Sequence, residues 1–101
     1  MQIPENGFYY HYKHHQEKGF NDHAYEVIGI AQHSEDKSYL VMYKPLYRAD
    51  WLAPAQCCVR PIEMFFEEVE FEGKTVPRFV KITDPKVISK LTEIRDQMYV
   101  S

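Results

Sequence analysis

The chain has 101 residues, of which 45% are hydrophobic and 27% are charged, and its formal net charge is −3. This composition excludes an intrinsically disordered chain, and the length allows one domain with one modest core. No apolar run approaches the ~20 residues that cross a bilayer, and residues 1–6 do not read as a signal peptide, so we expect a cytoplasmic protein without membrane contact. The acidic balance argues against nucleic acid as a partner.

The first predicted strand covers residues 7–13, because its run of aromatic side chains suits a half-buried pleated surface. Side chains alternate along a strand, so Tyr9 and His11 share one face. The polar segment 14–23 follows and is predicted to be a loop.

A central strand is predicted over residues 24–33, which are apolar on both faces at their centre. Gly29 within it indicates a bulge or a close backbone approach. A turn at 34–38 leads to a third strand over 39–47, in which Pro45 marks an edge or a bend.

Residues 48–56, which include Trp51, are predicted to be a loop, and residues 57–60 a short strand. One helical turn is expected at 61–66, because Pro61 suits a first helical position. A hairpin about Gly73-Lys74 is then expected, with strands over 67–72 and 75–82.

The C-terminal segment predicts an amphipathic helix over residues 85–98. Asp84 can cap it, and Pro85 suits its first position. Apolar residues recur in it at helical spacing, at Val87, Ile88, Leu91, Ile94 and Met98.

Together these elements predict a mainly β fold: an SH3-like small barrel or roll of five to six antiparallel strands with a C-terminal α-helix. The roll would occupy residues 1–83. Residues 84–101 would pack on the roll or on a second copy of the chain, which would give a homodimer.

Five short blocks occur in order along the chain: Gly7-x-Tyr9-x-His11-Tyr12-Lys13, Tyr25-x-Val27-x-Gly29-x-Ala31-x-His33-Ser34-Glu35, Val41-x-Tyr43-x-x-Leu46-Tyr47, Val59-Arg60-Pro61-x-x-Met64-Phe65 and Pro77-Arg78-Phe79. In this order they resemble the bacterial family of small proteins called domain of unknown function 1653, over residues 3–82. The resemblance implies an SH3-like β-roll. The chain departs from the family pattern at His14, where members usually have Gly, and at Cys58, where they tend to have Trp.

The side chains with metal-binding or nucleophilic chemistry give weak signals. Five histidines lie at 11, 14, 15, 23 and 33 without a recognised ligand spacing, so we expect solvated loop histidines rather than a metal site. The adjacent Cys57 and Cys58 would point to opposite sides of a strand, which favours ordinary core or surface thiols over a nucleophile. We predict no metal and no cofactor.

Arg60 and Arg78 are the more informative residues. Arg78 shares a predicted strand face with apolar residues, and a buried guanidinium must be paired. We favour a structural ion pair with Glu35 or Glu63 as the carboxylate. The alternative is an anion clamp, in which the arginines act with nearby histidines on a phosphate or carboxylate.

Fourteen Phe and Tyr residues cannot all be buried in so small a domain, so some are expected on the surface. We predict exposure for Tyr9 and Tyr47, which could line a groove for a peptide. The predicted ligand-binding residues are therefore Tyr9, His11, His33, Glu35, Tyr47, Arg60 and Arg78.

Two classes of function remain open. We favour a binding module that recognises a peptide, a protein or a small anionic ligand through this aromatic, Arg and His face. The alternative is a small enzyme in which His11 or His33 acts with Glu35 as general acid and base. A Gly-rich phosphate loop and a nucleophile elbow are both absent from the sequence, which favours the binding module.

Overall fold

The computed structural model describes residues 2–48 and 56–99, so almost all of the predicted loop at 48–56, including Trp51, lies outside the described residues. Within them lie the strands β1 (Gly7–His11), β2 (Ala24–Gln32), β3 (Tyr39–Pro45), β4 (Cys58–Pro61), β5 (Glu68–Phe71), β6 (Lys74–Pro77) and β7 (Phe79–Lys81). The helices are α1 (Ile62–Phe65), α2 (Pro85–Met98) and a 3-10 turn, η1 (Gln16–Lys18).

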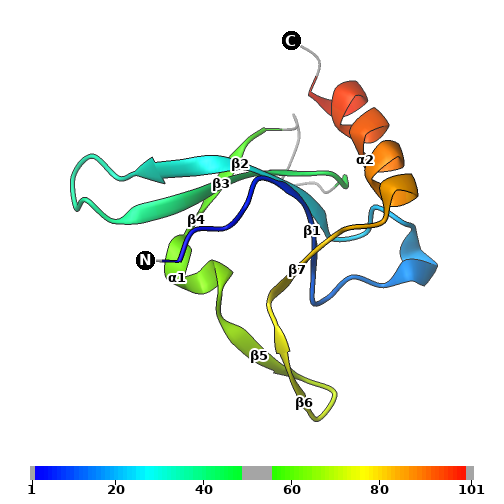
Figure 1. Cartoon of the computed structure of the whole chain (residues 1–101), viewed down its shortest axis with the longest axis horizontal. Helices are drawn as coiled ribbons and strands as arrows, with labels where there is room; N and C mark the ends of the chain where they lie inside the picture. The colour runs from blue at the N-terminus through cyan, green and yellow to red at the C-terminus, as the bar shows by residue number, and fades with distance from the viewer. Residues whose placement is uncertain (1, 49–55, 100–101) are drawn as a thin grey trace.

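Five of the strands form one antiparallel sheet in the order β4-β3-β2-β1-β7, and β5 and β6 form a separate hairpin (Figure 1). The last strand therefore returns to pair with the first, with Tyr10 opposite Val80. A mainly β fold with a C-terminal helix is thus confirmed. The prediction allowed a barrel or a roll; a closed barrel is not found among the described strands, because β4 and β7 stay the unpaired edges of the sheet.

The bulge predicted at Gly29 is present. The register between β2 and β3 shifts between Val27 and Gly29. A Cβ atom at Gly29 would lie 3.2 Å from Cε of Met42, which is tighter than ordinary packing. Glycine therefore suits this position because the end of the Met42 side chain lies against its backbone.

The strand predicted over residues 75–82 is divided at Arg78. Residues before it pair with β5, whereas residues after it pair with β1. The Arg78 amide donates to the carbonyl of Glu67 at 3.0 Å, and its carbonyl accepts from the Tyr12 amide at 2.8 Å. The chain changes partner here because each half satisfies its backbone groups on a different strand.

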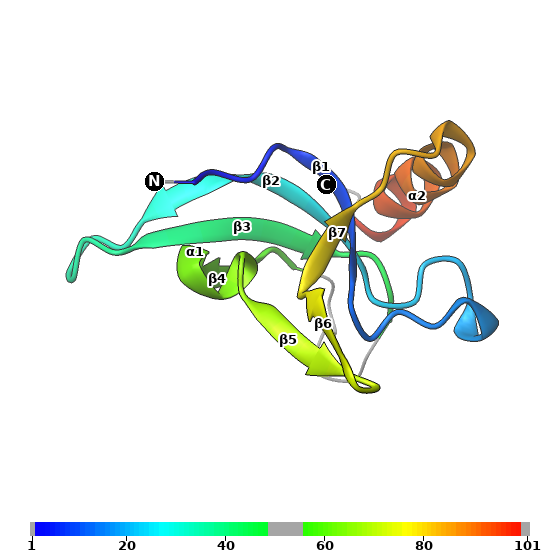
Figure 2. The ribbon, with the colours of Figure 1, turned by 60° about the horizontal axis from the view of Figure 1, so that its bottom comes forward.

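Apolar side chains fill two clusters, one on each face of the sheet. Figure 2 shows α1 and the β5–β6 hairpin on one side of the sheet and α2 on the other. The first cluster consists of Tyr9, Tyr25, Val27, Val41, Tyr43, Ile62, Phe65 and Phe79. The second consists of Phe8, Ala24, Leu46, Ile82 and Leu91. Adjacent residues of β1 thus enter different clusters, as strand alternation requires.

Helix α2 covers residues 85–98, as predicted, and packs on the sheet of its own chain. The Asp84 carboxylate accepts from the Lys86 amide at 2.9 Å and caps the first turn. Leu91 is fully buried, and the Arg95 guanidinium bonds Glu26 of β2 at 2.8 Å. No helix among the described residues is long and apolar enough to span a membrane. The division of the chain at residue 83 stays a prediction.

Replacing Leu91 by Ala should destabilise the protein by about 2–5 kcal/mol, because the lost side chain leaves a cavity between α2 and the sheet. Chemical denaturation followed by circular dichroism measures this. Ser89→Ala, at an exposed position of the same helix, is the control and should change stability by less than about 0.5 kcal/mol. Equal effects of the two substitutions would show that α2 is not docked.

Candidate functional site

The antiparallel order brings polar and aromatic side chains together at one end of the sheet. β1 and β3 end there, while β2, β4 and β7 begin there. We call this group the Arg60 site; it consists of His11, Tyr25, Tyr43, Tyr47, Arg60, Arg78 and Phe79. These residues come from segments far apart in the sequence, so pairing of the strands is what assembles them.

Arg60 lies across the face of the sheet on which the first apolar cluster packs. Its Cζ atom is 5.3 Å from the centre of the Phe79 ring and 5.9 Å from that of Tyr43. Such contacts stabilise a cation through the negative face of the ring. Within residues 2–48 and 56–99 no carboxylate pairs with Arg60, and its buried Nε has no hydrogen-bond partner.

Arg78 differs because its charge is balanced. Its Nη2 donates to Oε1 of Glu67 at 2.5 Å, and its side chain is 17% exposed. The structural ion pair expected for this residue is therefore present, but the predicted partners, Glu35 and Glu63, are wrong. The backbone bond between Arg78 and Glu67 places these two side chains next to each other.

His11 is buried at the end of β1 and is held in one protonation state. Only 8% of it is exposed, and its Nδ1 accepts the Lys13 amide at 3.1 Å. Burial, followed by the nearby His23 ring and the cations of Arg60, Arg78 and Lys13, lowers the pKa of His11 to about 4. The neutral ring therefore carries its proton on Nε2. This Nε2–H makes no hydrogen bond within the described part of the chain.

Tyr25, Tyr47 and Cys58, which lie near Arg60, are neutral as well. The hydroxyls of Tyr25 and Tyr47 are 2.8 Å apart and share a hydrogen bond. Burial raises the pKa of Tyr25 and of Tyr47, so both stay protonated. Burial and the adjacent Cys57 also raise the pKa of Cys58, which is the reverse of what an activated thiol requires.

Tyr9 lies in the same face but is not a surface residue. It is 7% exposed, and its ring packs edge-on against Phe65 at 5.2 Å. Its hydroxyl donates to the Glu5 carbonyl at 2.8 Å. The predicted exposure of Tyr9 is wrong because α1 covers the face that β1 turns towards it. Tyr47, the other predicted surface tyrosine, is half-buried.

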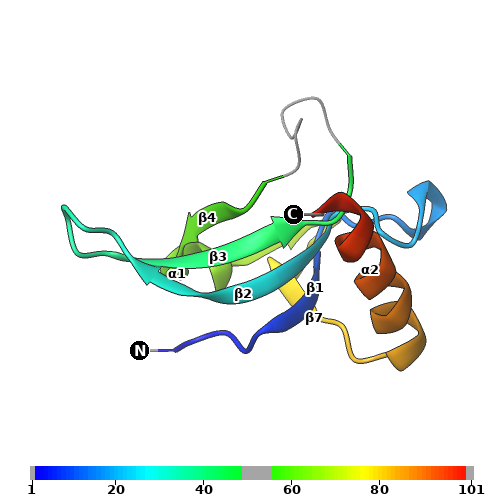
Figure 3. The same ribbon diagram turned by 90° about the horizontal axis from the view of Figure 1, so that it is seen from above.

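His33 and Glu35 lie at the opposite end of the sheet, in the turn of the β2–β3 hairpin, which extends away from β7 and α2 (Figure 3). The His33 Nδ1 accepts the amides of Glu35 and Asp36 at 3.1 and 3.4 Å, so it closes the turn. The predicted convergence of these residues with His11 and the arginines is therefore wrong. In the described residues the Glu35 carboxylate meets neither imidazole, so the predicted acid–base pair does not form.

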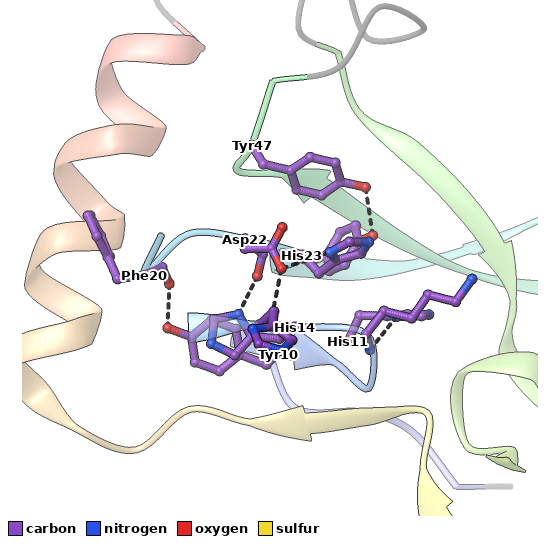
Figure 4. A network of polar contacts seen from close by, with 10 residues as sticks. Tyr10, His11, His14, Phe20, Asp22, His23 and Tyr47 are labelled. Atoms are coloured by element: carbon purple, nitrogen blue, oxygen red, sulfur yellow. Dashed lines mark hydrogen bonds and ion pairs between the residues drawn. The ribbon is translucent and has the colours of Figure 1, made fainter. Parts of the chain in front are cut away.

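A second polar network borders the site in the loop before β2 (Figure 4). The Asp22 carboxylate accepts the His15 amide at 2.8 Å and lies 3.1 Å from Nδ1 of His23. The His23 ring is 5.7 Å from that of His11 and 5.4 Å from that of Tyr47. No group of three or more potential metal ligands forms within the described ranges.

The predicted ligand-binding residues did not include His23, Tyr25, Tyr43, Phe79 and Glu67. For Tyr25 and Tyr43 a signal existed, because both are aromatic residues of predicted strands, and the pairing register places them on the same face as Tyr9. His23 was assigned to a solvated loop, and nothing local shows that this loop folds back onto the sheet.

The Arg78–Glu67 pair should make a measurable but modest contribution to stability. Glu67 is 52% exposed, so removal of Arg78 leaves a carboxylate that water can still solvate. We expect Arg78→Ala to cost about 1–2 kcal/mol, and a double-mutant cycle with Glu67→Gln to give a coupling of about 1 kcal/mol or less. Urea denaturation of the four proteins measures both values. A coupling of zero would contradict the pair.

Stability should fall as pH decreases from 6.5 to about 4, because the pKa of His11 is lower in the folded than in the unfolded chain. Over this range the unfolded state binds a proton that the folded state excludes. The loss should be on the order of 2 kcal/mol. In His11→Gln the loss should be smaller, whereas the exposed control His15→Gln should behave as wild type. Identical pH profiles for wild type and His11→Gln would refute this assignment.

Comparisons with known proteins agree with this architecture. A crystal structure of a DUF1653 protein from Bordetella bronchiseptica superposes with a TM-score of 0.62 and 28% sequence identity, covering 84% of this chain and 97% of that one. No curated protein was found to match. Residues 7–81 match the family described as "Protein of unknown function (DUF1653)", and this range includes every residue of the Arg60 site. The chain therefore belongs to the DUF1653 family, as the resemblance of its sequence blocks predicted.

Proposed function

We propose that this chain is a small binding module that holds an anionic group of a peptide, a protein or a small ligand against Arg60. The observation that carries the proposal is the unbalanced charge of this residue. Arg60 is fixed on two aromatic rings without a carboxylate among the described residues, while the adjacent Arg78 is neutralised by Glu67. A bound anion would supply the acceptors that its N–H groups lack.

His11 supports the same reading because it adds a donor but no charge. Its Nδ1 is occupied by the Lys13 amide, which leaves Nε2–H available for an acceptor. The buried Nε of Arg78 also lacks a partner among the described residues. Three sets of N–H donors without acceptors thus belong to one end of the sheet, which is the pattern of an anion site.

The fold and the overall charge support a module of this kind. The return of β7 to β1 supports the SH3-like roll that we infer for the chain, although β4 and β7 are not hydrogen-bonded. The related structure comes from a bacterium, which supports a bacterial module. The net charge of −3 supports a discrete site for one anion rather than a general polyanion surface.

Anion binding can be tested by NMR titration of the side-chain Nε–Hε resonances of the labelled protein. Sodium acetate and sodium phosphate are added separately at constant ionic strength, and we expect at least one of them to shift the Arg60 resonance saturably. Arg60→Gln should abolish the accompanying shifts of its neighbours. Arg48→Gln removes the same charge at an exposed position and should leave them unchanged.

Two outcomes of this titration would contradict the proposed function. If neither anion shifts Arg60, or if the neighbouring resonances respond equally in Arg60→Gln, the proposed function is wrong. The amide spectrum of each variant shows whether it is folded.

A further inference from the structure

We propose that the Arg60 site selects a carboxylate over phosphate, sulfate and other multiply charged anions, an inference that rests on the function proposed above. It concerns the chemistry of the ligand, which the presence of an arginine alone does not define. Three features of the structure carry it: the net charge of the site, the shape of its donors and the apolar groups around them.

The site offers about one net positive charge. Arg60 contributes a cation, whereas the charge of Arg78 is cancelled by Glu67 at 2.5 Å. His11 adds none, because a ring whose Nδ1 accepts the Lys13 amide is neutral. One charge matches a carboxylate, while a phosphate monoester carries about −1.5 to −2 at neutral pH.

The titratable groups that border the site do not change its net charge. The hydroxyls of Tyr25 and Tyr47 bond each other and are neutral. In the adjoining loop, the Asp22 carboxylate lies 3.1 Å from Nδ1 of His23, and the exposed Lys13 has its cation 5.8 Å from the centre of the Tyr12 ring, where water screens its charge. A dianion would therefore keep one charge uncompensated.

The donors have the shape that a carboxylate requires. The guanidinium of Arg60 is planar, and Phe79 and Tyr43 both lie within 6 Å of its central carbon. Ring contacts of this kind occupy the faces of a guanidinium and leave its edge, with paired N–H groups, for a ligand. Two parallel N–H groups bind two oxygens of a carboxylate at once, as they can with a phosphate, so this shape admits a carboxylate while the net charge and the apolar surroundings select it.

The apolar surroundings penalise a second negative charge. Tyr43 and Phe79 belong to the buried cluster, and Cys58 and Phe66 pack against it. An anion bound here gives up part of its hydration, and this cost rises steeply with charge. A monoanion needs only the N–H donors of the guanidinium edge and one further N–H, and the His11 Nε2–H has no partner among the described residues.

The test compares anions and carboxylate sources on the full chain by the same NMR titration. We expect acetate to bind at least fivefold more tightly than phosphate or sulfate at equal ionic strength. Three blocked pentapeptides then distinguish the source: Ac-AAVAA with a free C-terminus, Ac-AAEAA amide and Ac-AAVAA amide. At least one of the first two should shift Arg60, and the third, which has no carboxylate, should not.

A variant with the same positive charge distinguishes the effect of the charge from that of the planar guanidinium. Arg60→Lys retains the cation but lacks the planar fork, so acetate should bind more weakly, whereas the preference for acetate over sulfate, which comes from the single charge, should remain. Arg48→Lys, at an exposed position, should keep the wild-type affinity for acetate. Phosphate or sulfate binding at Arg60 as tightly as acetate would overturn the carboxylate inference and leave the binding module intact. A response to none of the anions would overturn both.

Discussion

The two edges of the sheet are joined by side chains instead of backbone hydrogen bonds, and the site depends on this contact. Phe79 begins the edge strand β7, and its ring stacks on Phe65 of α1 with centroids 4.6 Å apart and planes 9° from parallel. Arg60 of the other edge strand, β4, reaches the same ring at 5.3 Å. Because α1 directly follows β4, the aromatic stack holds β4 close to β7 and fixes where the guanidinium lies.

The same contact explains the electrostatics of the site. A cation–π contact contributes about 0.5–2 kcal/mol, which is less than the several kcal/mol that withdrawal of a guanidinium from water costs. The rings therefore position Arg60 but give its N–H groups no hydrogen-bond acceptors. Water or an anion must supply these acceptors. The positive charge also acts on its neighbours, since together with burial it keeps His11 neutral. A neutral His11 leaves the site with a single charge.

Patterns within short stretches of the sequence correctly predicted the local elements of the structure. The helix at 85–98 follows from the Asp84 cap and an apolar stripe, and the bulge from Gly29 within a strand. Sequence blocks singled out Arg60, Arg78 and His11, which the structure brings to one end of the sheet, but pairing across the sheet decides how they meet. Glu67 could not be identified as the partner of Arg78, because the change of strand partner at Arg78 brings them together. His33 has suitable chemistry for a site, yet its ring is used to close a turn.

The most direct test of this account is whether the Arg60 side chain contacts the Phe79 ring in solution. Nuclear Overhauser effects between the Arg60 side-chain protons and the ring protons of Phe79 would show the contact, and ring-current shifts of the Arg60 protons should accompany them. The account predicts both effects in the wild-type protein and their loss in Phe79→Leu. Arg60 protons at random-coil shifts, without Overhauser effects to the ring, would contradict it.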